Sequence, residues 1–278
     1  MYEKRVKELE NIAKEIRIDI LNMCHKCGEN NAHLGGCLSA VEILTVLFLE
    51  VMSTTNVKLP EAKDRFVLSK GHAGIALYAV LKQIGIVTQE EICKPLRGLN
   101  TDLFRHPKRN PNKYIEVSSG SLGLGFSYGV GLALAMKKKS FTERRTFVIV
   151  GDGECNEGSI WEAASFASHM KLDNLTVIVD KNGLQLDGFT NQIMEMDNIE
   201  ERWGAFGFNT VSVDGHDIAA LSRELTHSYD NRKPLAIIAN TIKGKGVSFA
   251  ENAPKWHDGF LNDTLYETAL KEINNANY

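Results

Sequence analysis

The chain has 278 residues, of which 43% are hydrophobic and 24% charged, and its formal net charge is −3. These globular values supply no bulk positive charge for nucleic acid or anionic membranes, so we expect neither as a partner. No apolar run reaches the roughly 20 residues that span a bilayer, and charge begins at Glu3, which favours a cytoplasmic protein. Five cysteines, an odd number, do not indicate a disulfide framework.

Three helices are predicted in the N-terminal third of the chain. Between Val6 and Met23, apolar residues recur every three or four positions, which predicts a helix with one buried face that ends near Gly28. Residues 38–52 are apolar on nearly every side and predict a buried helix, and residues 74–85 predict a third. Residues 94–113 contain three prolines and predict a long irregular loop, a type of segment that often carries function.

The rest of the chain has the pattern of a parallel α/β sheet. Short β-branched runs without polar alternation predict strands buried on both faces at Thr146–Val150, Leu175–Val179, Thr210–Val213 and Leu235–Ala239. Helical stretches at residues 159–169 and 218–229 are long enough for crossover connections. We therefore expect one doubly wound, mostly parallel α/β domain over residues 1–278, with helices on both faces of the sheet.

Oxygen-bearing side chains follow two neighbouring strands of this predicted sheet. Asp152 lies between two glycines directly after the first strand, and Asp180 and Asn182 follow the second. Ligands of open α/β sheets bind beyond the carboxyl ends of the strands, so Asp152 and Asn182 are expected to share a site. Carboxylate and amide oxygens suit Mg²⁺ or Ca²⁺ and do not suit zinc.

Gly151-Asp152-Gly153, closed by Asn182 after the next strand, resembles the thiamine diphosphate fingerprint. The resemblance implies that Asp152 and Asn182 bind the metal through their side chains and Leu184 through its backbone carbonyl. Backbone N–H groups near Gly153 and the helix that follows would meet the diphosphate. The implied cofactors are thiamine diphosphate and Mg²⁺, for which Ca²⁺ or Mn²⁺ would substitute.

Further segments resemble, in order, the landmarks of transketolases: Asn31–Ser39, Ser69–Ala73, His106-Pro107, Ser118–Gly125, Thr241–Gly246 and Lys255–His257. By this resemblance His33, His106 and His257 are catalytic and face the transferred sugar, while His72 and His257 lie near the diphosphate. The remaining implied cofactor contacts come from Gly120, Leu122, Gly151, Gly153, Asn182 and Leu186. Imidazoles suit this chemistry because they orient hydroxyls, shuttle protons and stabilise an alkoxide near neutral pH.

The implied activity is transfer of a two-carbon ketol unit from a ketose or ketose phosphate to an aldose. In this family, the Glu that activates thiamine diphosphate belongs to a pyrimidine-binding domain. We expect that domain and the C-terminal domain on a separate chain. The sequence is therefore interpreted as the N-terminal subunit of a split transketolase, which forms an α2β2 heterotetramer with a C-terminal subunit. The expected substrates are small sugars or sugar phosphates.

Three residues depart from the family pattern, and two rival interpretations remain. Leu34 stands where the family commonly has Pro after its first histidine, Lys108 stands where it commonly has an acidic residue after His106-Pro107, and Arg105 precedes His106. These changes favour a difference in substrate preference rather than in cofactor. A nicotinamide-dependent oxidoreductase would use the glycines at 120–129, but their spacing is not GxGxxG. The other alternative is a non-catalytic or specialised subunit of a related thiamine diphosphate enzyme.

The CxxC spacing at residues 24–27 is interpreted as structural.

Overall fold

A computed structural model describes residues 2–28, 32–52, 63–94, 96, 101–141, 144–196, 198–229 and 232–276. Its centre is a five-stranded, parallel sheet in the order β1-β2-β3-β5-β4. The strands are β1 (Arg65–Leu68), β2 (Thr146–Gly151), β3 (Leu175–Lys181), β4 (Asn209–Asp214) and β5 (Leu235–Asn240). The last four are the predicted strands, whereas β1 is too short to show a periodic signal.

The central strands are buried on both faces, as their continuous apolar runs predict. In β2, Phe147 and Ile149 pack into one hydrophobic cluster, and Val148 and Val150 pack into the cluster on the opposite face. This alternation follows from the two-residue period of a strand. The chain therefore forms a doubly wound α/β fold with one core on each face of the sheet, which confirms the predicted fold class.

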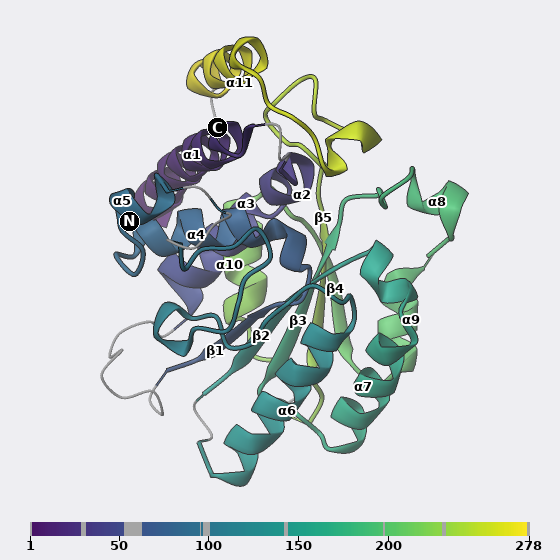
Figure 1. Ribbon diagram of the computed structural model, residues 1–278. Coiled ribbons are helices and arrows are strands. Elements are labelled where there is room, and N and C mark those ends of the chain that lie inside the picture. The colour runs from purple at the N-terminus through teal and green to yellow at the C-terminus, as the bar shows by residue number, and fades with distance from the viewer. Residues whose placement is uncertain are drawn as a thin grey trace.

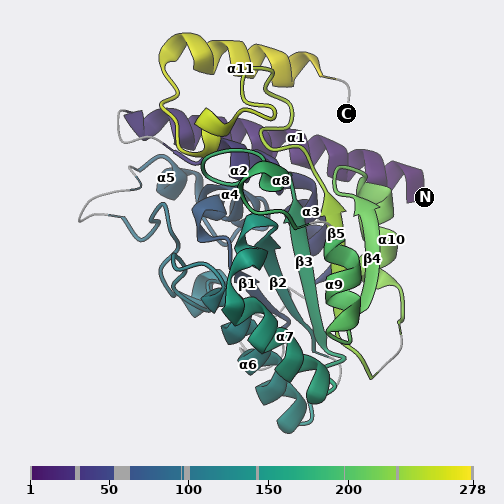
Figure 2. The ribbon, with the colours of Figure 1, turned by 90° about the vertical axis from the view of Figure 1, so that its right-hand side faces the viewer.

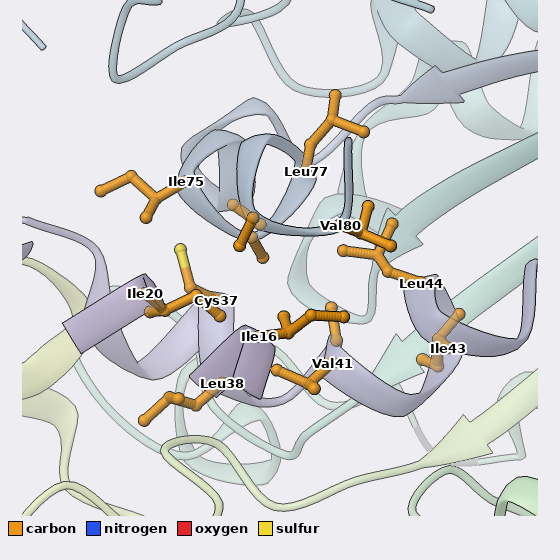
Figure 3. Packing of buried hydrophobic residues seen from close by; sticks show 14 of the residues in the cluster. Ile16, Ile20, Cys37, Leu38, Val41, Ile43, Leu44, Ile75, Leu77 and Val80 are labelled. Atoms are coloured by element: carbon orange, nitrogen blue, oxygen red, sulfur yellow. The ribbon is translucent and has the colours of Figure 1, made fainter. Parts of the chain in front are cut away.

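One face of the sheet is covered by N- and C-terminal helices. These are α1 (Tyr2–Lys26), α2 (Leu34–Leu38), α3 (Val41–Val46), α4 (Gly74–Gln83), α10 (Ile218–Thr226) and α11 (Asp263–Asn275). Helices α1 and α11 lie side by side (Figure 1). Ile16 and Ile20 of α1 lie near side chains of α2, α3 and α4 in this core, including Val41 and Val80 (Figure 3). The predicted stripe of α1 is thus its buried face.

The prediction of one continuous helix over residues 38–52 is wrong. The segment contains the end of α2, then α3, and then a π-helical turn over Leu47–Val51. Helical geometry is interrupted at Ala40, next to Ser39, whose hydroxyl donates to Asp180 of β3 at 2.6 Å. A continuous apolar run hides this interruption, because nothing local marks the contact with Asp180.

The opposite face is covered by α6 (Leu124–Lys138), α7 (Gly158–His169) and α9 (Ile199–Ala205) (Figure 2). Glycine permits close packing of α6 on the sheet. A Cβ atom on Gly129 would lie 2.3 Å from Cγ2 of Val148, so β2 leaves no room for a side chain there. Helix α6 therefore packs directly against the strand that ends at the predicted metal site.

Short elements complete the described chain. They are α5 (Gln89–Ile92), α8 (Thr190–Ile193) and 3-10 turns at Gly71–Ala73, Pro111–Lys113, Gly153–Asn156 and Pro254–His257. The described part of residues 94–113 is otherwise irregular, as predicted. All five cysteines are free, and Cys24 and Cys27 are buried in the core, which agrees with their structural interpretation. In the described part of the chain, no helix combines the length and apolar character needed to cross a bilayer.

Candidate active site

Asp152 lies at the carboxyl end of β2, where it is 4% exposed. Its Oδ1 accepts a hydrogen bond from the Gly153 amide at 2.8 Å, and its Oδ2 accepts one from the Gly183 amide at 2.7 Å. Gly183 follows β3 and has φ +73°, a left-handed conformation that glycine adopts without strain. The carboxylate is therefore held between the ends of two neighbouring strands, as predicted.

Asn182 and Leu184 lie on the same loop as Gly183. Oδ1 of Asn182 accepts from the Leu184 amide at 3.2 Å, and the Leu184 carbonyl accepts from Nζ of Lys243 at 3.4 Å. Burial and the nearby Asp180 carboxylate raise the pKa of Asp152 to about 6, so this site favours an added positive charge. The described residues include no group of three His, Cys, Asp or Glu side chains placed to hold a metal. The donors are instead a carboxylate, an amide oxygen and a carbonyl, a set that fits a hard cation.

A buried ion pair joins Asp180 of β3 to Lys70 after β1, and both side chains are at most 1% exposed. Asp180 also accepts hydrogen bonds from Ser39, Thr241 and, at 3.2 Å, from Nδ2 of Asn182. Burial raises the pKa of Asp180, but Lys70 and these donors outweigh it, so the pKa lies below its ordinary value. Lys70 lies in the segment Ser69–Ala73 that resembles a family landmark, but the sequence analysis assigned it no role of its own.

Glu154 is a third buried acid at this site, and the sequence patterns did not reveal it. It is 2% exposed and accepts from the amides of Gly123 at 2.8 Å and Gly151 at 3.0 Å, and from the Ser69 hydroxyl. The pKa of Glu154 is raised mainly by burial. Glu154 thereby connects the end of β2 to the turn that precedes α6. This turn carries the predicted cofactor residues Gly120 and Leu122.

Four histidines from distant segments form one cluster. The ring centroid of His33 lies 5.6 Å from that of His72, 5.4 Å from that of His106 and 5.5 Å from that of His257. The rings of His72 and His257 are 5.1 Å apart. His33 precedes α2, His72 follows β1, His106 lies in the irregular loop and His257 ends a 3-10 turn. The structure therefore brings together the four histidines that were predicted to lie at the site.

Backbone contacts hold the loops that carry these rings. Ala32 and Gly259 exchange two hydrogen bonds, at 2.9 and 3.1 Å, which joins the loop of His33 to the loop of His257. A Cβ atom on Gly36 would lie 3.0 Å from the ring of His72. A Cβ atom on Gly74 would lie 2.7 Å from Pro107, so the loop of His106 packs directly on the start of α4. Gly74 therefore has no room for a side chain, and a side chain at Gly36 would require the His72 ring to shift by a few tenths of an ångström.

Burial makes the clustered rings weak bases. It is the main cause that lowers the pKa of His33 to about 4 and that of His257 to about 3, and it also lowers the pKa of His72 and His106. Nζ of Lys243 lies 3.1 Å from Nδ1 of His257, and burial and then Lys70 lower the pKa of Lys243 to about 8. At neutral pH the rings are uncharged, and each offers one donor and one acceptor.

A buried network supports the segment that carries Lys243. His216 accepts a hydrogen bond from the Ile242 amide at 2.8 Å and its other ring nitrogen lies 2.9 Å from Glu42, whose second oxygen pairs with Arg17 at 2.6 Å. Because Nε2 of His216 accepts, Nδ1 of the neutral ring donates to Glu42. No local sequence pattern marks this role of His216, since its partners lie far away in the chain.

The other predicted cofactor residues differ in burial. Gly151 is buried at the end of β2, and a Cβ atom on Gly153 would lie 2.9 Å from the Gln185 side chain. Leu122 and Leu186 are 36% and 60% exposed, and Gly120 is also exposed. A Cβ atom on Gly71, the residue before His72, would lie 3.2 Å from the Gly120 amide nitrogen. The cofactor role of these three exposed residues stays a prediction.

Comparison with known proteins identifies relatives of this chain. Residues 9–273 match the family model described as transketolase, thiamine diphosphate binding domain. An apulose-4-phosphate transketolase subunit of Phocaeicola vulgatus is 38% identical over 273 residues, which are 97% of this chain and 95% of that protein. The protein of the same name from Actinobacillus succinogenes is 39% identical over 276 residues, 98% of each chain.

Solved structures agree with these relatives. Transketolase from Leishmania mexicana superposes with a TM-score of 0.86 at 28% sequence identity, over 96% of this chain. The chain spans 41% of the length of that solved transketolase. The fold of this chain therefore corresponds to one part of the longer Leishmania mexicana protein. In the two relatives compared by sequence, the aligned region is nearly the whole subunit.

Proposed function

The chain belongs to the transketolase family, whose thiamine diphosphate-binding domain it matches, and from this premise we propose that it is the N-terminal subunit of a split transketolase. Together with a C-terminal subunit, it transfers a two-carbon ketol unit from a ketose to an aldose. The observation that carries the proposal is the histidine cluster, with rings 5.1 to 5.6 Å apart, built beside the Asp152 and Asn182 loops. The name of the aligned relatives makes apulose 4-phosphate the first donor to test.

In this proposal, Mg²⁺ is held by the Asp152 and Asn182 side chains and the Leu184 carbonyl, against the diphosphate. The fit rests on the donor set and on the raised pKa of Asp152, about 6, which reflects a buried carboxylate beside a second one. Backbone at Gly151 and Gly153, with Gly120, Leu122 and Leu186, completes the cofactor contacts. Thiamine diphosphate, when bound, supplies the nucleophilic carbon at which a ketose is cleaved.

The histidines divide the remaining work. His33, His106 and His257 orient the sugar hydroxyls and move protons to and from them, which uncharged imidazoles can do. His72 and His257 also contact the diphosphate. Lys70 and Lys243 are buried cations close to this end of the site, and both place positive charge where a diphosphate carries negative charge. His257, which accepts from Lys243, links the two groups.

A C-terminal subunit with a pyrimidine-binding domain is proposed to cover exposed apolar side chains of α6, α7 and α8. These include Leu124 and Tyr128 of α6, Phe166 of α7, and Ile193 and Met194 at the end of α8, which are 45% to 61% exposed. Large exposed apolar groups of this kind mark interaction surfaces. The proposed assembly is a two-fold α2β2 heterotetramer in the cytoplasm, with two active sites.

Reconstitution tests this function. The purified chain is mixed with its C-terminal subunit, identified by co-purification, and ketol transfer from apulose 4-phosphate and other ketose phosphates is followed in the presence of thiamine diphosphate and Mg²⁺. We expect no transfer by the chain alone and transfer that saturates near a one-to-one ratio. Robust donor cleavage by the single chain would contradict the split arrangement, and no transfer by the stable complex with any ketose would contradict the proposed activity.

A further inference from the structure

An ion pair links the two loops that carry His106 and His257. Nη1 of Arg105 lies 3.5 Å from Oδ1 of Asp258, and each residue directly adjoins one of these histidines in sequence. The two side chains are 13% and 36% exposed, whereas His33 is 8% exposed as a residue. The pair therefore lies at the more exposed side of the histidine cluster.

Both loops are anchored independently of this pair. A Cβ atom on Gly74 would lie 2.8 Å from the carbonyl oxygen of Arg105, so the backbone of Arg105 packs against α4. On the other side, the two hydrogen bonds between Ala32 and Gly259 fix the residue that follows Asp258. Because the backbones are held elsewhere, the ion pair is not needed to bring the loops together. Arg105 and Asp258 can therefore influence the neighbouring histidine rings through their charges.

The two charges act on the same histidines with opposite signs. Asp258 raises the pKa of both His33 and His106, and Arg105 lowers both. Around His106, burial, Arg105 and Asp258 are the causes of its shift. Around His33, the neighbouring charged or titratable groups are Asp258, Arg105, His106, Lys243 and the rings of His72 and His257. Removing one member of the pair would leave the other charge uncompensated beside rings in a largely buried site.

We propose that Arg105 and Asp258 are a charge-balanced pair of positioning residues, in which each charge offsets the effect of the other on His33 and His106. Burial then keeps both rings uncharged, and so able to accept a proton from the sugar, across the neutral and mildly acidic range. The inference rests on the proposed function for its catalytic meaning. The expected effect of the two charges on the rings does not depend on that function. Asp258 without Arg105 would favour imidazolium, whereas Arg105 without Asp258 would oppose it.

The test compares Arg105→Gln, Asp258→Asn and the double variant Arg105→Gln/Asp258→Asn. Titration of the His106 ring, followed by NMR in the full chain, is expected to shift upward by roughly 0.5 to 1 pH unit in Arg105→Gln and downward in Asp258→Asn. The double variant should return to within a few tenths of a unit of the wild type. In the assembled enzyme, the acid limb of kcat/KM should move in the same directions.

The outcomes separate this inference from the proposed function. Shifts of the same sign in both single variants, or a double variant that does not return toward wild type, would overturn charge balancing and leave a purely structural pair. Opposite shifts in the NMR titration together with no ketol transfer by the wild-type complex would support the pair while contradicting the proposed function. Arg109→Gln, an exposed arginine on the same loop, serves as the matched control and should leave the His106 titration unchanged.

Discussion

The carboxylate end and the histidine end of the site are built in different ways. Asp152, Asn182 and Asp180 each engage backbone amides, hydroxyls or a buried lysine at 3.2 Å or less. In contrast, within the described residues the rings of the four histidines receive one hydrogen bond, from Lys243 to His257. Saturated polar groups hold a fixed geometry, whereas ring nitrogens without partners can bind hydroxyls that arrive with a substrate. The difference indicates a preformed cofactor end and a sugar end completed by its ligand.

Removal of a metal ligand should have the largest effect. Asp152→Ala is expected to weaken thiamine diphosphate binding by about 100-fold or more in the presence of Mg²⁺, because it removes the only carboxylate of the proposed metal site. Calorimetric titration of the assembled complex measures this affinity, and circular dichroism checks the fold. Asp173→Ala, the same change on the surface before β3, is the control. Equal cofactor affinity in Asp152→Ala and wild type would contradict the assignment of Asp152 as a metal ligand.

Changes at the sugar end should reduce turnover by a comparable or somewhat smaller factor. His33→Ala and His106→Ala are each expected to lower ketol transfer by a factor on the order of 100, as for lost proton transfer or oxyanion stabilisation. Steady-state rates at saturating thiamine diphosphate provide the measurement. His227→Ala, outside the cluster at the end of α10, should retain wild-type turnover. Normal turnover in both cluster variants would remove the histidines from the chemistry.

Lys243 joins the two ends, so its loss should affect both. Its ammonium contacts the Leu184 carbonyl and the His257 ring, and a hydrogen bond to a charged group contributes about 1.5 to 3 kcal/mol. We expect Lys243→Met to weaken both cofactor affinity and ketol transfer by roughly 10-fold. Lys245→Met, two residues along the same turn, is the control. An effect on one property alone would place Lys243 at one end of the site and not between them.

The smallest effect concerns stability in acid. The pKa of His33 is about 4 in the folded chain and near 6.5 when unfolded, so below pH 6.5 the unfolded state binds more protons. This contribution to stability is present above pH 6.5 and is lost as the pH falls through about 4. His33→Gln should therefore reduce the loss of unfolding free energy between pH 7 and pH 5 by about 1 to 2 kcal/mol. Urea unfolding at both pH values provides the comparison, and an unchanged loss in the variant would contradict a neutral, buried His33.

Local patterns predicted the sheet and the cofactor end, but not the contacts that fix them. The β-branched runs located β2 to β5 because strands buried on both faces need continuous apolar residues. The Asp152 and Asn182 pairing followed from adjacent strand ends, whereas the histidine cluster came from family resemblance. The Lys70–Asp180 pair joins residues 110 positions apart, and no local signal marks such a contact. For the same reason, the sequence did not predict the contacts of Glu154 and Lys243 or the interruption of the helix at Ala40.

The division between the two ends is tested most directly by one affinity measurement. In the assembled complex, the double variant His33→Ala/His106→Ala is titrated with thiamine diphosphate at saturating Mg²⁺. Because the metal ligands and the backbone around Asp152 are untouched, we predict an affinity within about threefold of wild type, a difference of less than roughly 0.7 kcal/mol, even though ketol transfer is lost. A loss of cofactor affinity comparable to that of Asp152→Ala would contradict this division, because His33 and His106 would then belong to the cofactor end.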